Sequence, residues 1–202
     1  MDRFVLEVPN FCPLELCKEL TTAFESVEDT IEPGELLYYA NNKLIYHSKK
    51  PNTELQLSMH PAFKWLDSKV SEYVSKAYKL YLKHLYREFD QNKKPFPHIF
   101  ERVFETKSVT DLGYGIQKIK RGGSYEWHID NFPDEPGSFV QLIIYLNTLE
   151  PNEGGTTELA NGRKIRPEMG KLLVWPCSWT FPHCGNEVKA EYKYILTTLI
   201  TL

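Results

Sequence analysis

The chain has 202 residues, of which 42% are hydrophobic and 13% aromatic, and its formal net charge is -3. This length and composition predict one globular domain over residues 1–202, with a sizeable core. The slight acidity argues against nucleic acid or an anionic membrane as a partner, and the sequence does not indicate an oligomeric state. Because the N-terminus is charged and no apolar run is long enough to span a bilayer, we expect a cytoplasmic protein.

Residues 1–100 are predicted to provide helical support and a hairpin. A short strand is expected over residues 3–8, followed by a helix whose first position suits Pro13 and whose apolar residues recur at helical spacing. From His60 to Phe89, apolar residues repeat at steps of three and four, with charged residues between them. This pattern predicts a long amphipathic helix that serves as scaffold.

A tyrosine-rich stretch at residues 36–47 has the pattern of a β-hairpin. Two strand-like runs meet at Asn41 and Asn42, and asparagine tolerates the positive φ of a tight turn. We favour a place for this hairpin in the core, because aromatic residues in strands mostly pack, with a lid as the alternative.

Residues 101–202 change in character to many short strands separated by Gly, Pro and Asn. Such spacing indicates a sandwich or a jelly roll, and helices that precede the strands fit a buttress on one face of an antiparallel double sheet. The expected fold class is therefore α+β, mainly β. The expected strands are 115–119, 125–130, 139–146, 156–159, 163–166, 171–175, 178–183 and 192–201.

The four cysteines show no C-x-x-C spacing, so they indicate neither a zinc knuckle nor a dithiol redox motif. Buried free thiols are the expected state. Cys184 stands apart only because it follows a histidine that belongs to the candidate site.

The stretch GGSYEWHIDNF, residues 122–132, contains a histidine and an aspartate two positions apart. In a β-strand such residues share a face, so His128 and Asp130 could chelate one ion. His183 closes the apolar run WTFPH and is the best candidate for a third ligand. Two histidines and one carboxylate are the ligand set of non-haem Fe(II) oxygenases, and zinc could occupy the same residues.

Lys193 lies in the apolar run EYKYILTTL, ten residues after His183. A lysine directed into a barrel must find an anion, because an unpaired buried charge is costly. A dicarboxylate cosubstrate would be such an anion. The alternative is that Lys193 points to solvent from an edge strand.

Several motifs in fixed order resemble one enzyme family. They are GGSYEWHID, IIYLN at 143–147, EGG at 153–155 and IRPEMGKLLVWP at 165–176, followed by His183 and Lys193. Together they resemble the catalytic core of the prolyl 4-hydroxylase-like family of Fe(II)- and 2-oxoglutarate-dependent dioxygenases. The N-terminal run VPNFCPLELCKEL is similar to the way these domains begin.

The resemblance implies a double-stranded β-helix (jelly roll) over residues 101–202, with the N-terminal helices supporting one face. By position in the motifs, His128, Asp130 and His183 would be metal ligands. Lys193 matches the basic residue that pairs with the distal carboxylate of 2-oxoglutarate, and Tyr145 matches a tyrosine that in some members bonds the same carboxylate.

One position departs from the family pattern. Many relatives have a tyrosine nine or ten residues before the first ligand histidine, where this chain has Ile119 and Lys118. The fine packing of the cosubstrate is therefore left open. The glycine pair Gly154 and Gly155 is expected to let a loop turn tightly beside the site.

Three aromatic residues near the motifs are candidates to line the pocket, with plain core packing as the alternative. They are Tyr125, Trp127 and Trp175.

The function implied by the resemblance is hydroxylation of a C–H bond, with a prolyl residue of a peptide or protein as the expected substrate. The implied cofactors are Fe(II), 2-oxoglutarate and O2, with ascorbate as an optional addition, and the products are succinate and CO2. Substrate contacts are expected from the loop at 131–139 and from the hairpin at 36–47.

Other functions stay open at this point. One alternative keeps the chemistry and takes a free amino acid or another small molecule as substrate. A second is a non-catalytic jelly-roll module that binds a metal, and a third is a zinc hydrolase with Glu126 as its base.

Overall fold

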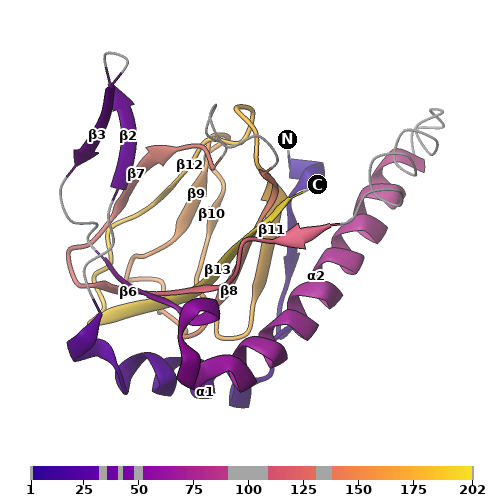
Figure 1. The fold of residues 1–202 in the computed structure, drawn as a ribbon. Coiled ribbons are helices and arrows are strands. Elements are labelled where there is room, and N and C mark those ends of the chain that lie inside the picture. Colours follow the sequence, from indigo (N-terminus) through magenta and orange to yellow (C-terminus); the bar gives the residue numbers. More distant parts are fainter. Residues whose placement is uncertain are drawn as a thin grey trace.

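Two antiparallel sheets face each other, and two helices cover the outer face of the larger sheet (Figure 1). The computed structural model describes residues 2–31, 36–40, 43–47, 52–90, 109–130 and 138–201. The helices are α1 (Leu14–Glu25) and α2 (Lys64–Asp90), with short 3-10 turns at Asp2–Phe4, Glu28–Thr30, Leu57–Met59 and Pro61–Phe63. The strands are β1 (Leu6–Val8), β2 (Leu36–Ala40), β3 (Lys43–His47), β4 (Asn52–Gln56), β5 (Thr110–Asp111), β6 (Gly115–Lys120), β7 (Tyr125–His128), β8 (Ser138–Tyr145), β9 (Thr157–Leu159), β10 (Lys164–Ile165), β11 (Leu172–Pro176), β12 (His183–Gly185) and β13 (Tyr192–Thr201).

The strand order confirms the predicted jelly roll. The larger sheet runs β1-β11-β8-β13-β6-β4, with β5 paired to β13, and the smaller sheet runs β10-β9-β12-β7. Sheet neighbours such as β8 and β13 are distant in the sequence and antiparallel. With both helices on one face of the larger sheet, the fold is the expected α+β class with a mainly β core.

Successive side chains of β13 point into two different clusters of the core. Tyr194 and Leu196 pack in the cluster between the larger sheet and the helices. Ile195 points the other way and packs in the cluster between the two sheets. A strand that is covered on both faces can be apolar throughout, which is why β13 lacks the polar alternation of a half-exposed strand.

The helices bury the apolar stripes that their sequence spacing predicts. Pro13 precedes α1 with a φ of -58° instead of occupying its first position, and α2 begins at Lys64, after a 3-10 turn. Among the described helices, none has both the length and the apolar character needed to cross a bilayer. The buried residues of the stripes include Leu16, Leu20, Ala23 and Phe24 on α1, and Val70, Val74, Ala77, Tyr81 and Leu85 on α2.

Two of the predicted strands differ most from the observed ones. The strand expected over residues 178–183 is wrong: Phe181 N donates to Ser178 O (2.9 Å) in a turn, and Pro182 has no N–H for a ladder. The strand β12 begins only at His183. The first strand is shorter than expected, because residues 2–4 form a 3-10 turn and pairing starts at Leu6.

The predicted hairpin at 36–47 forms, as β2 paired with β3 from Leu36↔His47 to Ala40↔Lys43. These two strands make a separate two-stranded sheet. The turn at Asn41 and Asn42 and the side chains of the hairpin lie outside the described residues, as does most of the loop at 131–139.

Phe24 joins α1 to the larger sheet and offers a direct test of the core. Its side chain is fully buried and meets the Tyr194 ring edge to face, with 5.9 Å between ring centroids. We expect Phe24→Ala to lower the free energy of unfolding by about 3–5 kcal/mol, because truncation removes apolar contact and leaves a cavity. The control Leu14→Ala alters a side chain that is 48% exposed, and we expect a change within about 0.5 kcal/mol. Urea unfolding of both variants measures the difference; equal midpoints would contradict this packing.

Candidate active site

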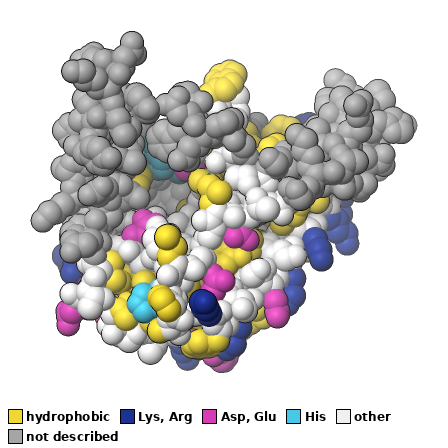
Figure 2. All heavy atoms as spheres, in the orientation of Figure 1, with side chains coloured by type: hydrophobic (Ala, Val, Ile, Leu, Met, Phe, Trp, Pro, Cys, Tyr) yellow, Lys and Arg dark blue, Asp and Glu magenta, His cyan; other side chains and the backbone are white. Residues whose placement is uncertain are grey.

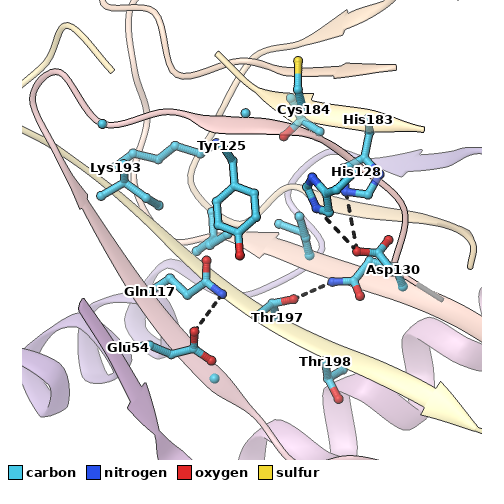
Figure 3. A pocket seen from close by; sticks show the side chains of 18 of the residues that line it. Glu54, Gln117, Tyr125, His128, Asp130, His183, Cys184, Lys193, Thr197 and Thr198 are labelled. Atoms are coloured by element: carbon cyan, nitrogen blue, oxygen red, sulfur yellow. Dashed lines mark hydrogen bonds and ion pairs between the residues drawn. The ribbon is translucent and has the colours of Figure 1, made fainter. Parts of the chain in front are cut away.

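Three predicted ligands converge at one end of the smaller sheet (Figure 3). His128 ends β7, His183 begins β12, and the two residues are direct cross-strand partners. Asp130 Oδ1 lies 3.7 Å from His128 Nε2 and 3.6 Å from His183 Nε2. Asp130 follows β7 in a bend and not in the strand itself, yet it faces the same point as His128. Within the described residues, this is the one such cluster of three possible metal ligands.

Backbone carbonyls orient both imidazole rings. His128 Nδ1 lies 2.7 Å from Glu126 O, and His183 Nδ1 lies 3.2 Å from Phe181 O. A neutral ring that donates from Nδ1 presents the Nε2 lone pair, which is the form that binds a metal. Burial lowers the pKa of His183 to about 4, so this ring is neutral at physiological pH.

Trp175 holds the carboxylate of Asp130. Its Nε1 donates to Asp130 Oδ2 at 3.1 Å, which leaves Oδ1 toward the histidines. The fully buried indole also meets the His183 ring edge to face, with 4.8 Å between centroids. Burial raises the pKa of Asp130 to about 6, while His128 and the indole N–H act in the opposite direction. A bound cation would also lower the pKa of Asp130.

The donor set fits a divalent metal ion. Two ligand atoms that each lie about 2.1 Å from a shared ion are at most about 4.2 Å apart. Both distances from Asp130 to the histidines fall inside this limit. Two neutral imidazoles and one carboxylate suit Fe(II) and also zinc, so the donors alone do not choose between them.

A bulge in β7 places two side chains on the same side. His183 pairs with His128 and Gly185 pairs with Tyr125, so the register shifts by one residue. Tyr125 therefore lines the pocket beside His128, with 4.8 Å between their ring centroids. Glu126 and Trp127 are both exposed, which argues against Glu126 as the base of a zinc hydrolase. Of the three candidate pocket aromatics, only Tyr125 lines the cavity, whereas Trp175 belongs to the core.

The cluster of three candidate ligands opens into a cavity of about 290 Å³ that also contains Lys193. Lys193 is only 5% exposed, so the solvent-facing alternative is wrong. Its Nζ lies 5.6 Å from the centroid of the Tyr145 ring. Burial lowers the pKa of Lys193 to about 8, because the ammonium form loses its hydration inside the protein.

Tyr145 is fully buried, and the described lining of the cavity does not include it. Its hydroxyl lies 2.7 Å from Thr157 Oγ1, and Thr157 does line the cavity. Tyr145 therefore positions a second hydroxyl that the sequence reasoning missed. Threonine is common in strands, and only the pairing of Thr157 with Gly185 on β12 brings it to the site.

The two residues at the family tyrosine position face opposite ways. Ile119 lines the cavity, opposite Lys193 in the β6–β13 register. Lys118 points to the helices, where its Nζ lies 2.9 Å from Glu25 and 2.6 Å from Glu28. An apolar side chain thus stands where many relatives have the tyrosine.

The glycine pair forms the tight turn that its sequence predicts. Gly154 and Gly155 have φ values of 69° and 66°. A Cβ on Gly154 would lie 2.2 Å from Glu187 O, and one on Gly155 would lie 2.6 Å from Leu149 Cδ1. Only glycine avoids both the strain and the collision, so the turn can lie directly beside Lys193.

The indole of Trp175 should influence metal affinity without touching the metal. We expect Trp175→Phe to lower Fe(II) affinity about 10- to 100-fold, because Asp130 loses the donor that orients it. Anaerobic Fe(II) titration gives the measurement. The control Trp179→Phe changes a side chain that is 79% exposed and should leave the affinity unchanged. Equal affinities in the two variants would show that the bond has no such effect.

Residues 114–201 match the 2OG-Fe(II) oxygenase superfamily, and this range contains the whole cluster and Lys193. Together with the cluster of His128, Asp130 and His183, this match supports the use of Fe(II) and 2-oxoglutarate, with O2 as the usual co-substrate. The fold is the jelly roll that solved prolyl hydroxylases share. No curated protein matches the sequence.

Solved structures share this fold over nearly the whole chain. A prolyl hydroxylase from Trichoplax adhaerens, in complex with a hypoxia inducible factor peptide fragment, has a TM-score of 0.69 at 17% identity, covering 98% of this chain and 84% of that one. A Pseudomonas putida prolyl-4-hydroxylase has a TM-score of 0.63 at 15% identity, with coverages of 98% and 91%. A collagen prolyl hydroxylase of Paramecium Bursaria Chlorella virus-1, in complex with 2OG, has a TM-score of 0.60 at 16% identity, with coverages of 98% and 95%.

Proposed function

We propose that this dioxygenase hydroxylates a prolyl residue in a peptide or protein. The observation that carries the proposal is a three-residue ligand cluster that shares one cavity with a buried lysine. Prolyl hydroxylases share the fold along the whole chain, and one of them is in complex with a peptide. Their shared architecture supports a peptide substrate.

In this proposal His128, Asp130 and His183 hold Fe(II). Bound there, iron supplies the activation of O2, coupled to conversion of 2-oxoglutarate to succinate and CO2. Two neutral histidines and one carboxylate neutralise only part of the charge of a bound Fe(II). The loaded site would therefore carry a net positive charge, which suits an anionic cosubstrate.

The protein side chains bind and orient the reactants. The Lys193 ammonium pairs with the distal carboxylate of 2-oxoglutarate, and Thr157, held by Tyr145, offers a hydroxyl from the smaller sheet, which faces it. Ile119 and Ile195 keep this end of the cavity apolar and so exclude water around the ion pair. Tyr125 lines the cavity beside His128, with 4.8 Å between ring centroids, and would contact the prolyl ring (Figure 3).

The test is succinate formation by anaerobically purified protein that is reconstituted with Fe(II), with and without ascorbate, and then exposed to air. A pool of proline-containing peptides should stimulate turnover, and mass spectrometry should find one added oxygen on proline. Turnover that no peptide stimulates would reject the prolyl substrate and leave the oxygenase class intact. Absence of succinate despite bound iron would favour a non-catalytic metal-binding module.

A further inference from the structure

We propose that Gln141 and Thr197 bind the substrate backbone, at the N–H and C=O groups of one residue adjacent to the proline that is hydroxylated. The inference rests on the proposed function and adds to it the part of the peptide that the enzyme recognises. It concerns two neutral polar side chains of the cavity that neither the ligand cluster nor the cosubstrate explains.

Gln141 lies on β8 and points between the two sheets. Its neighbours Val140 and Leu142 pack in the cluster toward the helices, and successive side chains of a strand point to opposite faces. Gln141 lines the cavity, although it is only 6% exposed. A buried amide is costly unless its polar atoms find partners, so its hydrogen bonds indicate its role.

The hydrogen bonds of Gln141 occupy only one end of its amide. Nε2 donates to Leu142 O at 3.4 Å and to Thr197 Oγ1, and the second bond is the dashed line at Thr197 in Figure 3. A backbone carbonyl can only accept, so this contact fixes which end of the amide is the nitrogen. Among the described residues, no donor bonds Gln141 Oε1. A buried and oriented acceptor therefore remains for a ligand.

Thr197 adds a donor beside this acceptor. Its hydroxyl oxygen accepts from Gln141, which leaves its own proton to donate. In the part of the chain that the structure describes, this proton has no acceptor. Because Thr197 also lines the cavity, an acceptor and a donor lie next to each other on the same wall.

This pair lies beside the metal ligands and away from the lysine. Gln141 is the direct cross-strand partner of Trp175, whose indole bonds Asp130. Thr197 follows Lys193 by four residues on β13, which is roughly 13 Å, since a strand rises about 3.3 Å per residue. Figure 2 shows a hollow in the molecular surface in which histidine and acidic side chains are visible. The cosubstrate carboxylate is held at the lysine end, so the pair is left for the substrate.

The backbone of an extended peptide matches an adjacent acceptor and donor. In a β-strand the N–H and C=O of one residue point to the same side, as in the hydrogen-bonded pairs of an antiparallel sheet. Proline has no N–H, so the residue that is bound must be a neighbour of the proline. Consecutive residues are about 3.8 Å apart, which keeps a neighbour close to the wall while the proline faces the metal. A free amino acid offers no such neighbour.

The experiment uses capped peptides with one proline, in which an ester oxygen replaces the backbone N–H of one residue, at each of three positions on either side. The ester removes the donor without adding bulk. The variants are Gln141→Met and Thr197→Val. Readouts are kcat/KM for hydroxylation and, without O2, peptide binding by fluorescence anisotropy to protein loaded with Fe(II) and 2-oxoglutarate.

Two comparison variants match these substitutions. Gln117→Met changes another glutamine of the cavity lining, which donates to Glu54 at 3.2 Å. Gln117 lies on β6, two strand steps from β8, or roughly 10 Å. Thr201→Val repeats the threonine substitution at the end of β13, outside the described lining of the cavity.

In wild type, the ester at one position adjacent to the proline should weaken binding and lower kcat/KM about tenfold, the value of one hydrogen bond to a buried acceptor. Esters farther away should have little effect. Gln141→Met should bind the parent peptide about tenfold more weakly and lose the ester penalty, whereas Gln117→Met should keep the penalty. Thr197→Val should weaken the parent peptide, and Thr201→Val should not.

The ester series with wild type needs no variant, so it tests the proposal whatever the stability of the variants. Equal hydroxylation of all the ester peptides, or an ester penalty that survives in Gln141→Met, would overturn the role of Gln141 and leave the proposed function standing. Parent-peptide affinity equal to wild type in Thr197→Val would remove Thr197 from the pair. If wild type hydroxylates no peptide and binds none, the proposed function itself fails.

Discussion

His183→Ala is expected to abolish hydroxylation and to lower Fe(II) affinity by more than the 10- to 100-fold that removal of an outer partner costs. The reason is local: His183 is buried, neutral and oriented, with Nε2 aimed at the same point as Asp130 Oδ1. Two remaining ligands would bind iron weakly and without fixed geometry. Anaerobic Fe(II) titration and peptide-dependent succinate formation measure the two effects separately.

The control for this variant is His84→Ala. His84 is a histidine of α2 whose Nε2 lies 2.8 Å from Arg3 O, and the described lining of the cavity does not include it. It should retain iron binding and turnover. Circular dichroism of both variants shows whether the fold persists. Iron affinity and turnover equal to wild type in a folded His183→Ala protein would remove this residue from the ligand set.

Short-range pattern was enough to predict much of this architecture. Alternating and continuous apolar runs predicted most strands of the jelly roll, because residues buried on one or both faces must be apolar. The long helix followed from steps of three and four residues, and its bounds differ only by an initial turn. The false strand at 178–183 arose because an apolar run that contains proline resembles a strand until its hydrogen bonds are counted.

The candidate site was predictable only in part, since its residues are joined by strand pairing and not by sequence distance. His128 and Asp130 are close in sequence, whereas Thr157 and Glu54 reach the cavity through pairings with Gly185 and Gln117. No local pattern distinguishes these two residues from ordinary strand residues. The bulge that turns Tyr125 inward is likewise a property of the β7–β12 pair and not of β7 alone.

Lys193→Met is expected to raise the KM for 2-oxoglutarate by roughly 10- to 150-fold and to leave Fe(II) binding unchanged. The variant keeps the apolar stem and removes the charge that would pair with the distal carboxylate, a bond worth roughly 1.5–3 kcal/mol. Steady-state succinate formation at increasing 2-oxoglutarate concentrations measures the change. A KM equal to that of wild type would show that the carboxylate binds elsewhere.

The pKa of Lys193, lowered to about 8 by burial, gives this prediction a pH dependence with a definite sign. Below this pKa the free protein holds the ammonium form that attracts the anion, and above it the amine is neutral. The KM for 2-oxoglutarate in wild type should therefore rise as pH increases through about 8, and binding there should take up a proton. Lys193→Arg stays charged and should show a flatter profile, whatever its absolute KM. A wild-type KM that is constant up to about pH 9.5 would contradict the assignment.

The same lowered pKa links cosubstrate binding to stability. In the folded protein without 2-oxoglutarate, protonated Lys193 is disfavoured relative to the unfolded chain, where the ordinary pKa is 10.5. Lys193 therefore lowers the free energy of unfolding most below about pH 8. This destabilisation disappears as the pH rises above 10.5, the pKa of lysine in the unfolded chain. Lys193→Met should accordingly unfold at a higher temperature than wild type near neutral pH, and 2-oxoglutarate should stabilise wild type far more than the variant. Thermal unfolding with and without 2-oxoglutarate distinguishes two roles of Lys193, binding of the cosubstrate carboxylate and packing in the core. A packing role predicts that Lys193→Met is less stable than wild type.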